Sequence, residues 1–217
     1  FGVPTVEVDG RLFWGLDSLP MLAACLRGDP WFDGPQWDAA AVPRPGVVRL
    51  VQELRAAGLR LAIATTTSPE NVEVLLRTTL AALPPGSFEV IGAGDIVPAK
   101  KPAPDIYRWV LDRLGLTGSA GIAIEDSRNG VRAARAAGLP VAVTQSTYTV
   151  NEDFTGAVAV VSDLGEPGRP FTIRYGSVHG RQWVGPELLR AWASEASAVV
   201  GAAAAQPAPS FCSGPSV

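Results

Sequence analysis

Residues 121–138 read GIAIEDSRNGVRAARAAG, and they decide the fold that the sequence predicts. The apolar residues 122–124 predict a buried strand, which ends at two adjacent carboxylates, Glu125 and Asp126. Ser127 then suits the start of a helix, and an alanine-rich helical stretch follows. Acids that stand between a buried strand and a helix lie at the carboxyl edge of an α/β sheet, where ligands bind in such folds.

The two adjacent carboxylates of Glu125 and Asp126 are unfavourable side by side unless another group stabilises them. Like charges repel each other, so a cation often holds such a pair, and oxygen ligands suit a hard cation such as Mg²⁺. The alternative is that one acid caps the helix while the other is solvated. The chain has a single histidine, His179, which disfavours a histidine-based zinc site and a Ser-His-Asp triad.

The composition indicates a globular protein with one α/β domain and appendages, or with two small domains. The chain has 217 residues, of which 47% are apolar, enough for a sizeable core. Its formal net charge of −3 argues against non-specific binding of nucleic acid. No uncharged apolar run reaches the roughly 18 residues that suggest a membrane-spanning helix, so we expect no membrane partner.

The cysteines and the first residues bear on the cellular compartment. Cys25 and Cys212 are too few and too far apart to indicate a disulfide framework, which suits a cytoplasmic location. The chain begins at Phe1 without a basic segment before an apolar one, so we expect no signal peptide. It also lacks an initiator methionine, which is typical of a fragment or a processed product.

From Pro43 onward, helical and strand patterns alternate along the chain. Helices are expected near residues 45–57, 68–80, 104–114 and 131–137, and strands near residues 59–64, 88–91, 122–124, 141–143 and 157–161. Strands that alternate with helices in this way predict a parallel, doubly wound, Rossmann-like sheet.

The flanking segments have weaker patterns. Residues 1–28 predict a β-hairpin followed by a short helix, and residues 29–42 predict a linker rich in Pro, Gly, Asp and Trp. Residues 165–200 are expected to form a C-terminal extension with a short hairpin and an amphipathic helix at 186–200. Residues 201–217 have low complexity and are expected to be disordered.

Three polar stretches meet at the carboxyl edge of such a sheet. Thr65 and Thr66 follow a buried strand and precede a helix, where hydroxyl and backbone N–H groups favour phosphate binding. Lys101 offers a cation near the next helix start, and Glu125 and Asp126 offer oxygen ligands for Mg²⁺. Each has an ordinary alternative, a helix cap or a solvated side chain, but their order and spacing together are more specific.

Three strings carry a resemblance to a known family: PRPGVVRLVQELRAAGLRLAIATTTSPEN at 43–71, KPAPDIY at 101–107 and IAIEDSRNGVRAARAAGL at 122–139. Together they resemble the haloacid dehalogenase superfamily, in its branch of CbbY-like and β-phosphoglucomutase-like phosphatases. The resemblance covers residues 43–164. It implies a Mg²⁺-dependent phosphatase or phosphomutase that acts on a small phosphorylated metabolite.

The resemblance also implies roles for individual residues. Thr65 takes the position of the phosphate-binding hydroxyl, with Thr66 beside it, and Lys101 takes that of the lysine that neutralises the phosphate. Glu125 and Asp126 match the metal-binding acids of the family's fourth motif.

The sequence departs from this family at its start. Family members begin with a strand that ends in D-x-D-G-T, whose first aspartate is the nucleophile and whose second is the acid/base, and the chain has no such string. The nearest match, residues 6–12, would offer only Glu7 and Asp9 as substitutes. About 30 residues separate Leu12 from Pro43, too few for the helical cap of this branch.

Residues 1–28 resemble a different fold. Val-Pro-Thr at 3–5 and FWGLDSLPML at 13–22 are similar to the cis-proline loop and the entry to the last helix of DsbA-like thioredoxin proteins, in particular the 2-hydroxychromene-2-carboxylate isomerase branch. The chain therefore looks like a haloacid dehalogenase-type core without its first motif and cap, joined to the end of an unrelated fold.

These resemblances leave three hypotheses for the function. The first is a Mg²⁺-dependent phosphatase that is inactive or severely impaired because the nucleophilic aspartate is missing. The second is a non-enzymatic, truncated or fused remnant that still binds phosphate or Mg²⁺ weakly. The third is a fragment of a thioredoxin-type isomerase, which lacks its catalytic half. The first two hypotheses differ in whether the carboxylate of Glu7 or Asp9 lies close to that of Asp126. We expect that neither does.

The missing motif also predicts a gap in the sheet. In the family, the first-motif strand lies between the strands that end at Thr65 and at Asp126. Residues 5–8 or 12–14 could fill this position beside the strand at 61–64, or the N-terminal hairpin could remain a separate lobe.

Overall fold

The computed structural model describes residues 5–8, 11–14, 26–28, 43–77, 80–146 and 149–204, with the strands at 5–8 and 11–14 described by their backbone alone. The helices are α3 (Val47–Ala56), α4 (Pro69–Arg77), α5 (Asp105–Leu114), α6 (Arg128–Ala136) and α7 (Pro186–Ala204), with a 3₁₀ turn at Gly118–Ala120. The strands are β1 (Thr5–Val8), β2 (Arg11–Trp14), β3 (Ala62–Ala64), β4 (Val90–Gly92), β5 (Ala123–Glu125), β6 (Val141–Thr144), β7 (Ala159–Val161) and β8 (Ile173–Tyr175).

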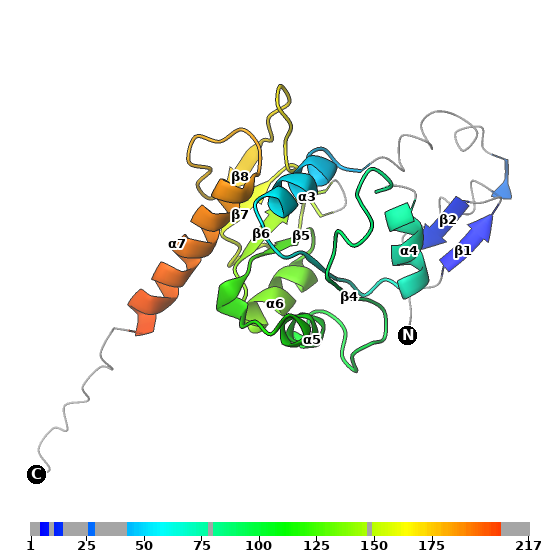
Figure 1. The fold of residues 1–217 in the computed structure, drawn as a ribbon, viewed down its shortest axis with the longest axis horizontal. Coiled ribbons are helices and arrows are strands. Elements are labelled where there is room, and N and C mark those ends of the chain that lie inside the picture. Colours follow the sequence, from blue (N-terminus) through cyan, green and yellow to red (C-terminus); the bar gives the residue numbers. More distant parts are fainter. Residues whose placement is uncertain are drawn as a thin grey trace, which may run out of the picture.

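The parallel strands are divided between two sheets. β5, β6 and β7 run parallel, and β8 adds to β7 in the antiparallel direction, which gives the order β5-β6-β7-β8. β3 and β4 form a separate parallel pair. The predicted α/β class with a parallel sheet is confirmed, and the elements alternate along the chain as the sequence indicated (Figure 1).

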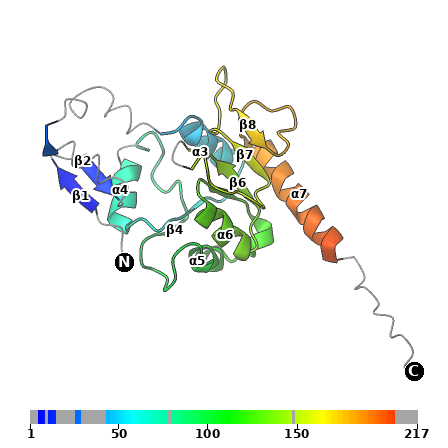
Figure 2. The ribbon, with the colours of Figure 1, turned by 180° about the vertical axis from the view of Figure 1, so that it is seen from behind.

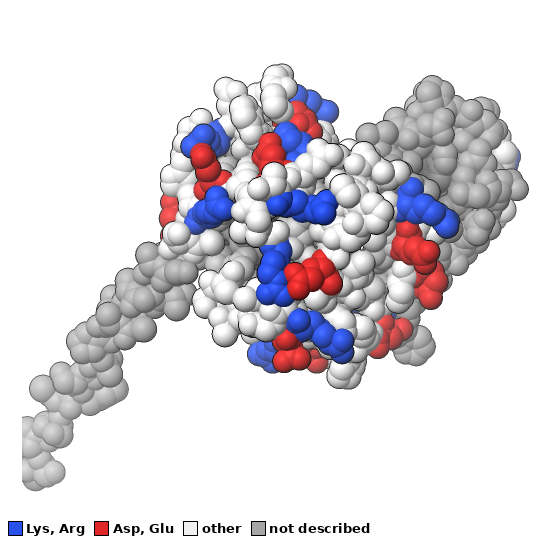
Figure 3. Space-filling model, viewed as in Figure 1, with Lys and Arg blue, Asp and Glu red and all other residues white. Residues whose placement is uncertain are grey.

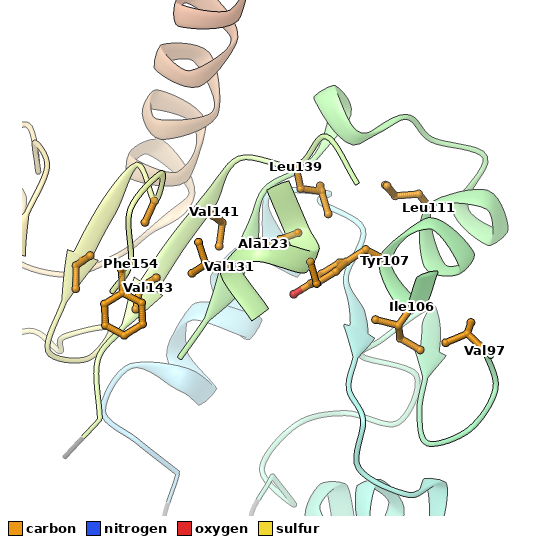
Figure 4. Close-up of a cluster of buried hydrophobic side chains, with 14 residues drawn as sticks. Val97, Ile106, Tyr107, Leu111, Ala123, Val131, Leu139, Val141, Val143 and Phe154 are labelled. Atoms are coloured by element: carbon orange, nitrogen blue, oxygen red, sulfur yellow. The ribbon is translucent and has the colours of Figure 1, made fainter. Parts of the chain in front are cut away.

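Two apolar cores cover the two faces of the larger sheet. Val141 and Val143 of β6 point into a core that α5 and α6 cover, which we call the α5–α6 core (Figure 4). Ala142, between them, points into a core that includes residues of α3 and α7, which we call the α3–α7 core. Strand residues alternate between faces, and parallel strands are buried on both, so this pattern accounts for the near-continuous apolar run of β6.

Local signals in the sequence account for the ends of two helices. Ser127 has an extended backbone, and its hydroxyl accepts a hydrogen bond from the Gly130 N–H at 3.2 Å, which caps the start of α6. Gly115 ends α5 with a φ of 64°, a left-handed conformation that glycine adopts without a steric penalty.

The segment after Leu164 packs into the α3–α7 core. Phe171, Val184 and Trp192 are buried in the α3–α7 core (Figure 2 shows α7 from the other side). The hairpin expected here forms differently, because β8 pairs with β7 and only a single bridge joins Glu166 to Arg169. α7 continues to Ala204, past the expected end of the helix at residue 200 and into the stretch expected to be disordered, and residues 205–217 lie outside the described residues.

Arg49 of α3 forms hydrogen bonds with the segment after Leu164 and so connects it to α3. Its guanidinium donates to the carboxylates of Glu53 and Glu166, each at 3.0 Å, and to the backbone oxygens of Gly165 at 2.8 Å and Val184 at 3.1 Å. Because Glu166 also accepts from the Gly46 N–H at 2.9 Å, the start of α3 is tied to the loop that follows β7.

The N-terminal hairpin forms as predicted, but it does not complete the β3–β4 sheet. Thr5 of β1 pairs with Trp14 of β2 in a two-stranded antiparallel sheet of their own. Of the two arrangements expected from the sequence, the structure therefore has the separate hairpin. The short helix expected to run to Leu26 and the linker at 29–42 fall almost entirely outside the described residues.

Acidic and basic side chains lie next to one another on the face shown in Figure 3. Exposed ion pairs of this kind join Arg60 to Glu89 at 2.5 Å and Lys100 to Asp95 at 2.8 Å. Such surface pairs contribute little to stability, so the two apolar cores carry most of it. Over the part of the chain that the structure describes, no helix is both long enough and apolar enough to span a membrane.

We expect Trp192→Ala to lower the free energy of unfolding by about 3–5 kcal/mol, because the substitution empties a large site in the core. Trp192 has no exposed surface, and its indole N–H donates to the Ser177 carbonyl at 2.7 Å. The measurement is chemical denaturation of both proteins. Trp183 is 37% exposed, so Trp183→Ala is the matched control and should cost about 1 kcal/mol or less. Equal losses for the two variants would contradict this account of the α3–α7 core.

Candidate active site

Lys101 brings together the three stretches that the sequence singled out. Its ammonium group donates to the Ala64 carbonyl at 2.9 Å and to Glu125 Oε1 at 2.5 Å. Ala64 is the last residue of β3 and Glu125 is the last residue of β5, so Lys101 links the carboxyl ends of the two sheets. The predicted site residues Lys101 and Glu125 are in direct contact, and Thr65 follows immediately after Ala64.

Thr65 and Thr66 lie in the turn between β3 and α4. The Thr65 N–H donates to the Gly92 carbonyl at 2.9 Å, and its hydroxyl oxygen accepts from the Thr67 N–H at 3.1 Å. A threonine hydroxyl has a proton to donate as well as lone pairs that accept, so Thr65 can still donate to a ligand. Both threonines are half-buried at the start of α4, where backbone N–H groups favour an anion.

Glu125 is a buried acid whose carboxylate is held by protein groups. It is 8% exposed, and Oε1 accepts from the Tyr107 hydroxyl as well as from Lys101. Lys101 also lies over the Tyr107 ring, with the ammonium nitrogen 4.9 Å from the ring centre. A buried carboxylate is tolerated when a cation and hydrogen bonds satisfy it, and Glu125 has both.

Tyr107 is a site residue that sequence reasoning missed. It lies on α5, where its neighbours Ile106, Val110 and Leu111 face the interior, and it is 7% exposed. The sequence does contain a signal for it, a tyrosine on an otherwise apolar helix face, because a buried tyrosine hydroxyl usually needs a hydrogen-bond partner. Burial, the charge of Glu125 and the hydrogen bond to it raise the pKa of Tyr107 far above its usual value.

Gly130 makes room for Glu125 in the first turn of α6. A Cβ atom at this glycine would lie 1.8 Å from Glu125 Oε2 and 2.6 Å from Oε1. Real side chains do not come this close, so a side chain at residue 130 would displace the Glu125 carboxylate from its present position.

Asp126 is more exposed than its neighbour, although the protein still removes part of the water around its carboxyl group. Desolvation and the charge of Glu125 raise the pKa of Asp126 above its usual value, while the charges of Lys101 and Arg44 partly oppose this. Ionised Asp126 is therefore disfavoured by its surroundings, and a bound cation would relieve the repulsion from Glu125.

Arg44 is the second residue that sequence reasoning did not select. Its guanidinium donates to the Thr144 carbonyl at 3.0 Å, to the Thr144 hydroxyl at 3.2 Å, to the Gln145 carbonyl at 2.8 Å and to the Ser162 carbonyl. It thereby holds the loops that leave β6 and β7 in place beside Asp126. Its position between two prolines gave no sign of these contacts, which depend on tertiary structure.

The donor set fits a single hard cation held largely by water. Asp126 offers an exposed carboxylate, whereas one oxygen of Glu125 is already bound by Lys101 and Tyr107. Across the described ranges, no three His, Cys, Asp or Glu side chains form a metal-binding group. Mg²⁺ often keeps several waters and uses one or two carboxylates with substrate phosphate, so these residues can accommodate it.

The carboxylates of Glu7 and Asp9, the two possible substitutes for the nucleophile, lie outside the described part of the structure. Glu7 pairs with Leu12 through the backbone of the β1–β2 hairpin, and its side chain lies outside the described part of the structure. Asp9 lies outside the described residues altogether. Whether either carboxylate approaches Asp126 therefore stays a prediction.

Comparison with known proteins agrees with this fold and identifies the family. The family model of haloacid dehalogenase-like hydrolases matches residues 28–138, about half of the chain. The chain belongs to the haloacid dehalogenase-like hydrolases. The CbbY protein encoded on a plasmid of Cupriavidus necator is 47% identical over 150 residues, which cover 69% of this chain and 58% of that protein.

Solved structures show the same relationship. Crystal structures of CbbY from Rhodobacter sphaeroides, one with phosphate and one with xylulose-(1,5)bisphosphate, match 55% of this chain and 53% of theirs at 47% identity, with a TM-score of 0.53. A putative β-phosphoglucomutase from Thermotoga maritima matches 67% of this chain and 72% of its own at 27% identity, with a TM-score of 0.52. The chain spans only about half the length of the curated CbbY relatives, between 53% and 58%.

We expect Tyr107→Phe to lower the free energy of unfolding by about 1–3 kcal/mol, because it removes a hydrogen bond from a buried carboxylate. Chemical denaturation at neutral pH measures the effect. Tyr175 is 62% exposed on β8, so Tyr175→Phe is the matched control and should change stability by less than about 0.5 kcal/mol. A Tyr107 variant as stable as this control would show that the hydroxyl contributes nothing.

The same pair should differ in alkaline solution. The native pKa of Tyr107 is raised, whereas the unfolded chain has an ordinary tyrosine pKa of about 10. The stability gained from keeping the proton is therefore complete below about pH 10 and is lost as the pH rises further, because unfolding then releases a proton. Above about pH 10 the parent should lose stability more steeply than Tyr107→Phe. Parallel pH profiles would contradict the assignment.

Proposed function

We propose that the carboxyl-edge site binds the phosphate group of a small phosphorylated metabolite, and that the chain is a haloacid dehalogenase-like phosphatase with impaired turnover. The observation that carries this proposal is the position of Lys101, whose ammonium group joins the end of β3 to the buried Glu125. That geometry holds a cation directly beside Thr65, at the start of α4.

The phosphate would be held by three kinds of donor. Thr65 supplies its hydroxyl, the Thr65–Thr66 turn and the start of α4 supply backbone N–H groups, and Lys101 supplies the positive charge. Glu125 Oε1 accepts a hydrogen bond from the Lys101 ammonium group at 2.5 Å, which neutralises part of the charge of the lysine. Tyr107 donates a hydrogen bond to the same oxygen. The lysine thus remains able to attract a dianion while it stays fixed in position.

Asp126, with Glu125 behind it, would hold Mg²⁺ at the same edge. The ion would polarise phosphoryl oxygens and screen the charge between phosphate and carboxylates. Arg44 would keep the neighbouring loops in position through its contacts with Thr144, Gln145 and Ser162. The bound ion would also lower the cost of ionising Asp126, whose pKa is raised by desolvation and by the charge of Glu125.

The substrate class is inferred from the relatives. The Rhodobacter sphaeroides CbbY structures contain phosphate and xylulose-(1,5)bisphosphate, and a sugar phosphate is accordingly the class that we propose here. Turnover would be impaired because the sequence has no D-x-D-G-T string to supply a nucleophilic aspartate. In-line attack tolerates little misplacement, so a glutamate in its place would be a poor substitute.

The second candidate is a non-enzymatic protein that binds phosphate or Mg²⁺ through the same residues. It is favoured by the exposed carboxylate of Asp126, since one carboxylate and water suffice for weak binding of the metal. The thioredoxin-type isomerase remains a proposal for the origin of residues 1–28 alone.

We expect Lys101→Met to weaken the binding of orthovanadate, a phosphate mimic, by about ten- to a hundredfold, because a hydrogen bond to a charged group is lost. Isothermal titration calorimetry in the presence of Mg²⁺ is the measurement. Lys100→Met is the matched control, because Lys100 is the adjacent residue and pairs with Asp95 at 2.8 Å, and its affinity should stay within about twofold of the parent.

A second variant guards against misfolding in this test. Lys101→Met leaves Glu125 buried with one partner fewer, so its circular dichroism must match that of the parent. Thr65→Val removes a hydroxyl without touching the Lys101–Glu125 pair and should weaken vanadate binding by about three- to tenfold. If both variants bind vanadate as tightly as the parent and have native circular dichroism spectra, the proposed phosphate site is contradicted.

Catalysis is tested separately from binding. With Mg²⁺ and p-nitrophenyl phosphate, we expect hydrolysis by the parent to stay near the level of a buffer blank, because the nucleophile is missing. Asp126→Asn and Lys100→Met, as site variant and control, should both give this same level. Robust turnover that disappears only in Asp126→Asn would show that another group serves as the nucleophile and that the enzyme is intact.

A further inference from the structure

Tyr107 contacts both of the charged groups on which the proposed phosphate site depends. Its hydroxyl donates a hydrogen bond to Glu125 Oε1, and its oxygen lies 3.5 Å from the Lys101 ammonium nitrogen. Tyr107 is only 7% exposed. A phenylalanine would fill almost the same volume without bringing a polar group into the interior, so the hydroxyl calls for an explanation.

The position of this hydroxyl is fixed by α5. Ile106 and Val110, on either side of Tyr107 along the helix, are 1% and 6% exposed. Both pack on β4, because a Cβ atom at Gly92 would lie 2.9 Å from Val110 Cγ2 and 3.1 Å from Ile106 Cδ1. Figure 4 shows the Tyr107 side chain extending from α5 toward Ala123 of β5. A closely packed helix therefore carries the hydroxyl to β5.

Lys101 has three N–H donors, because an ammonium group has that number and no acceptor. Two of them are engaged by the Ala64 carbonyl at 2.9 Å and by Glu125 Oε1 at 2.5 Å. The Tyr107 oxygen, at 3.5 Å, lies beyond the range of about 2.7–3.2 Å that is usual for N–H···O bonds. One N–H group of Lys101 is therefore left with at most a weak partner in the described part of the chain.

Groups from three elements surround the ammonium nitrogen. Ala64 ends β3, Glu125 ends β5, and the ring of Tyr107 on α5 has its centre 4.9 Å from the nitrogen. The Lys101 side chain is nevertheless 13% exposed, so part of it remains open. An anion beside Thr65, the residue that follows Ala64, would supply the partner that the third N–H group lacks.

Tyr107 also changes how strongly Glu125 neutralises Lys101. A carboxylate only accepts hydrogen bonds, and Oε1 receives one from the neutral hydroxyl as well as one from the ammonium group. The hydroxyl stabilises the carboxylate without adding charge, so the carboxylate depends less on the lysine. With phenylalanine at residue 107, Lys101 would be the main partner of that oxygen and would form a tighter ion pair with it. Less of its charge would then act on a phosphate.

We propose that Tyr107 is a positioning residue for the phosphate site, because its hydroxyl and ring keep one N–H group of Lys101 directed at the bound anion. The inference rests on the proposed function and adds the residue that sets the affinity of the lysine for phosphate. In this role Tyr107 binds neither phosphate nor metal and acts only through Lys101 and Glu125. The alternative is a purely structural role, in which the hydroxyl satisfies the buried carboxylate and affects stability alone.

Tyr107→Phe tests this role through the affinity for orthovanadate in the presence of Mg²⁺, measured by isothermal titration calorimetry on the whole chain. We expect binding about three- to tenfold weaker than that of the parent, the range that loss of one hydrogen bond gives. Tyr175→Phe is the matched control, because Tyr175 is 62% exposed on β8, and its affinity should stay within about twofold. Both variants are compared at a temperature at which circular dichroism shows them fully folded, so a loss of stability alone would leave the affinity unchanged.

A double-mutant cycle shows whether Tyr107 acts through Lys101. In the Lys101→Met background, Tyr107→Phe should change the vanadate affinity by less than about twofold, because the group on which it acts is missing. In the Thr65→Val background, Tyr107→Phe should still weaken binding by about three- to tenfold, because the Thr65 hydroxyl binds the anion separately from the lysine.

The ammonium signal of Lys101 in ¹⁵N NMR gives a second measurement, which does not need the double variant to fold. Lys101→Met identifies the signal by its loss. Vanadate should shift this signal in the parent and equally in Tyr175→Phe. In Tyr107→Phe the shift at saturation should be smaller, because the third N–H group is no longer directed at the anion.

The outcomes separate this inference from the proposed function. If Lys101→Met weakens vanadate binding but Tyr107→Phe binds as tightly as Tyr175→Phe, the phosphate site stands and the role of Tyr107 is overturned. An equal loss in the parent and Lys101→Met backgrounds, or an unchanged ammonium shift at saturation, would assign Tyr107 the purely structural role. If Lys101→Met itself binds as the parent does, the phosphate site fails, and the role of Tyr107 fails with it.

Discussion

The hydrogen bonds of one ammonium group hold the carboxyl edge of this protein together. Lys101 binds the last carbonyl of β3 and the buried carboxylate at the end of β5, and none of the strands that the structure describes pairs with both of these strands. A buried carboxylate without a cation is strongly disfavoured, so the orientation of Glu125 depends on this bond. Tyr107 completes the arrangement by donating to the same oxygen.

Apolar side chains provide the rest of the connection between the two sheets. Ile106 of α5 is almost fully buried in the same cluster as Val131 of α6 and Ala123 of β5. α5 also packs on the β3–β4 pair, since a Cβ atom at Gly92 of β4 would lie 2.9 Å from Val110. The two sheets are thus fixed relative to each other by helix packing, which is non-directional, and by one lysine, which is directional.

Much of the fold could be predicted, because local signals and tertiary structure agree there. The apolar residues of α5 recur at helical spacing and end at Gly115, and the buried run of β6 has the pattern of a parallel strand. Glu125, Asp126, Thr65 and Lys101 were identified because acids, hydroxyls and cations at the ends of successive strands must share one edge. The prediction that Glu125 and Asp126 together hold a metal stays a prediction, although the structure places them differently: Glu125 is buried against Lys101 and Asp126 is exposed.

The remaining features depend on contacts between residues that are distant in sequence. Arg44 contacts Thr144, 100 positions away, and Arg49 contacts Glu166, 117 positions away, so no local pattern could indicate either contact. β8 joins the sheet in the antiparallel direction with exposed side chains, which leaves no alternation to read. α7 extends beyond residue 200 because alanine favours helix, although the same residues have the low complexity that suggested disorder.

The close approach of Gly130 to Glu125 constrains how this sequence can change over time. With 1.8 Å between a Cβ at residue 130 and Glu125 Oε2, even alanine would push the carboxylate out of its place between Lys101 and Tyr107. A shorter acid at residue 125 would free that space but would no longer fill it or reach both partners. The two positions are therefore coupled: a side chain gained at residue 130 would change the selection on residue 125, because its carboxylate would no longer reach Lys101 and Tyr107 in the same way.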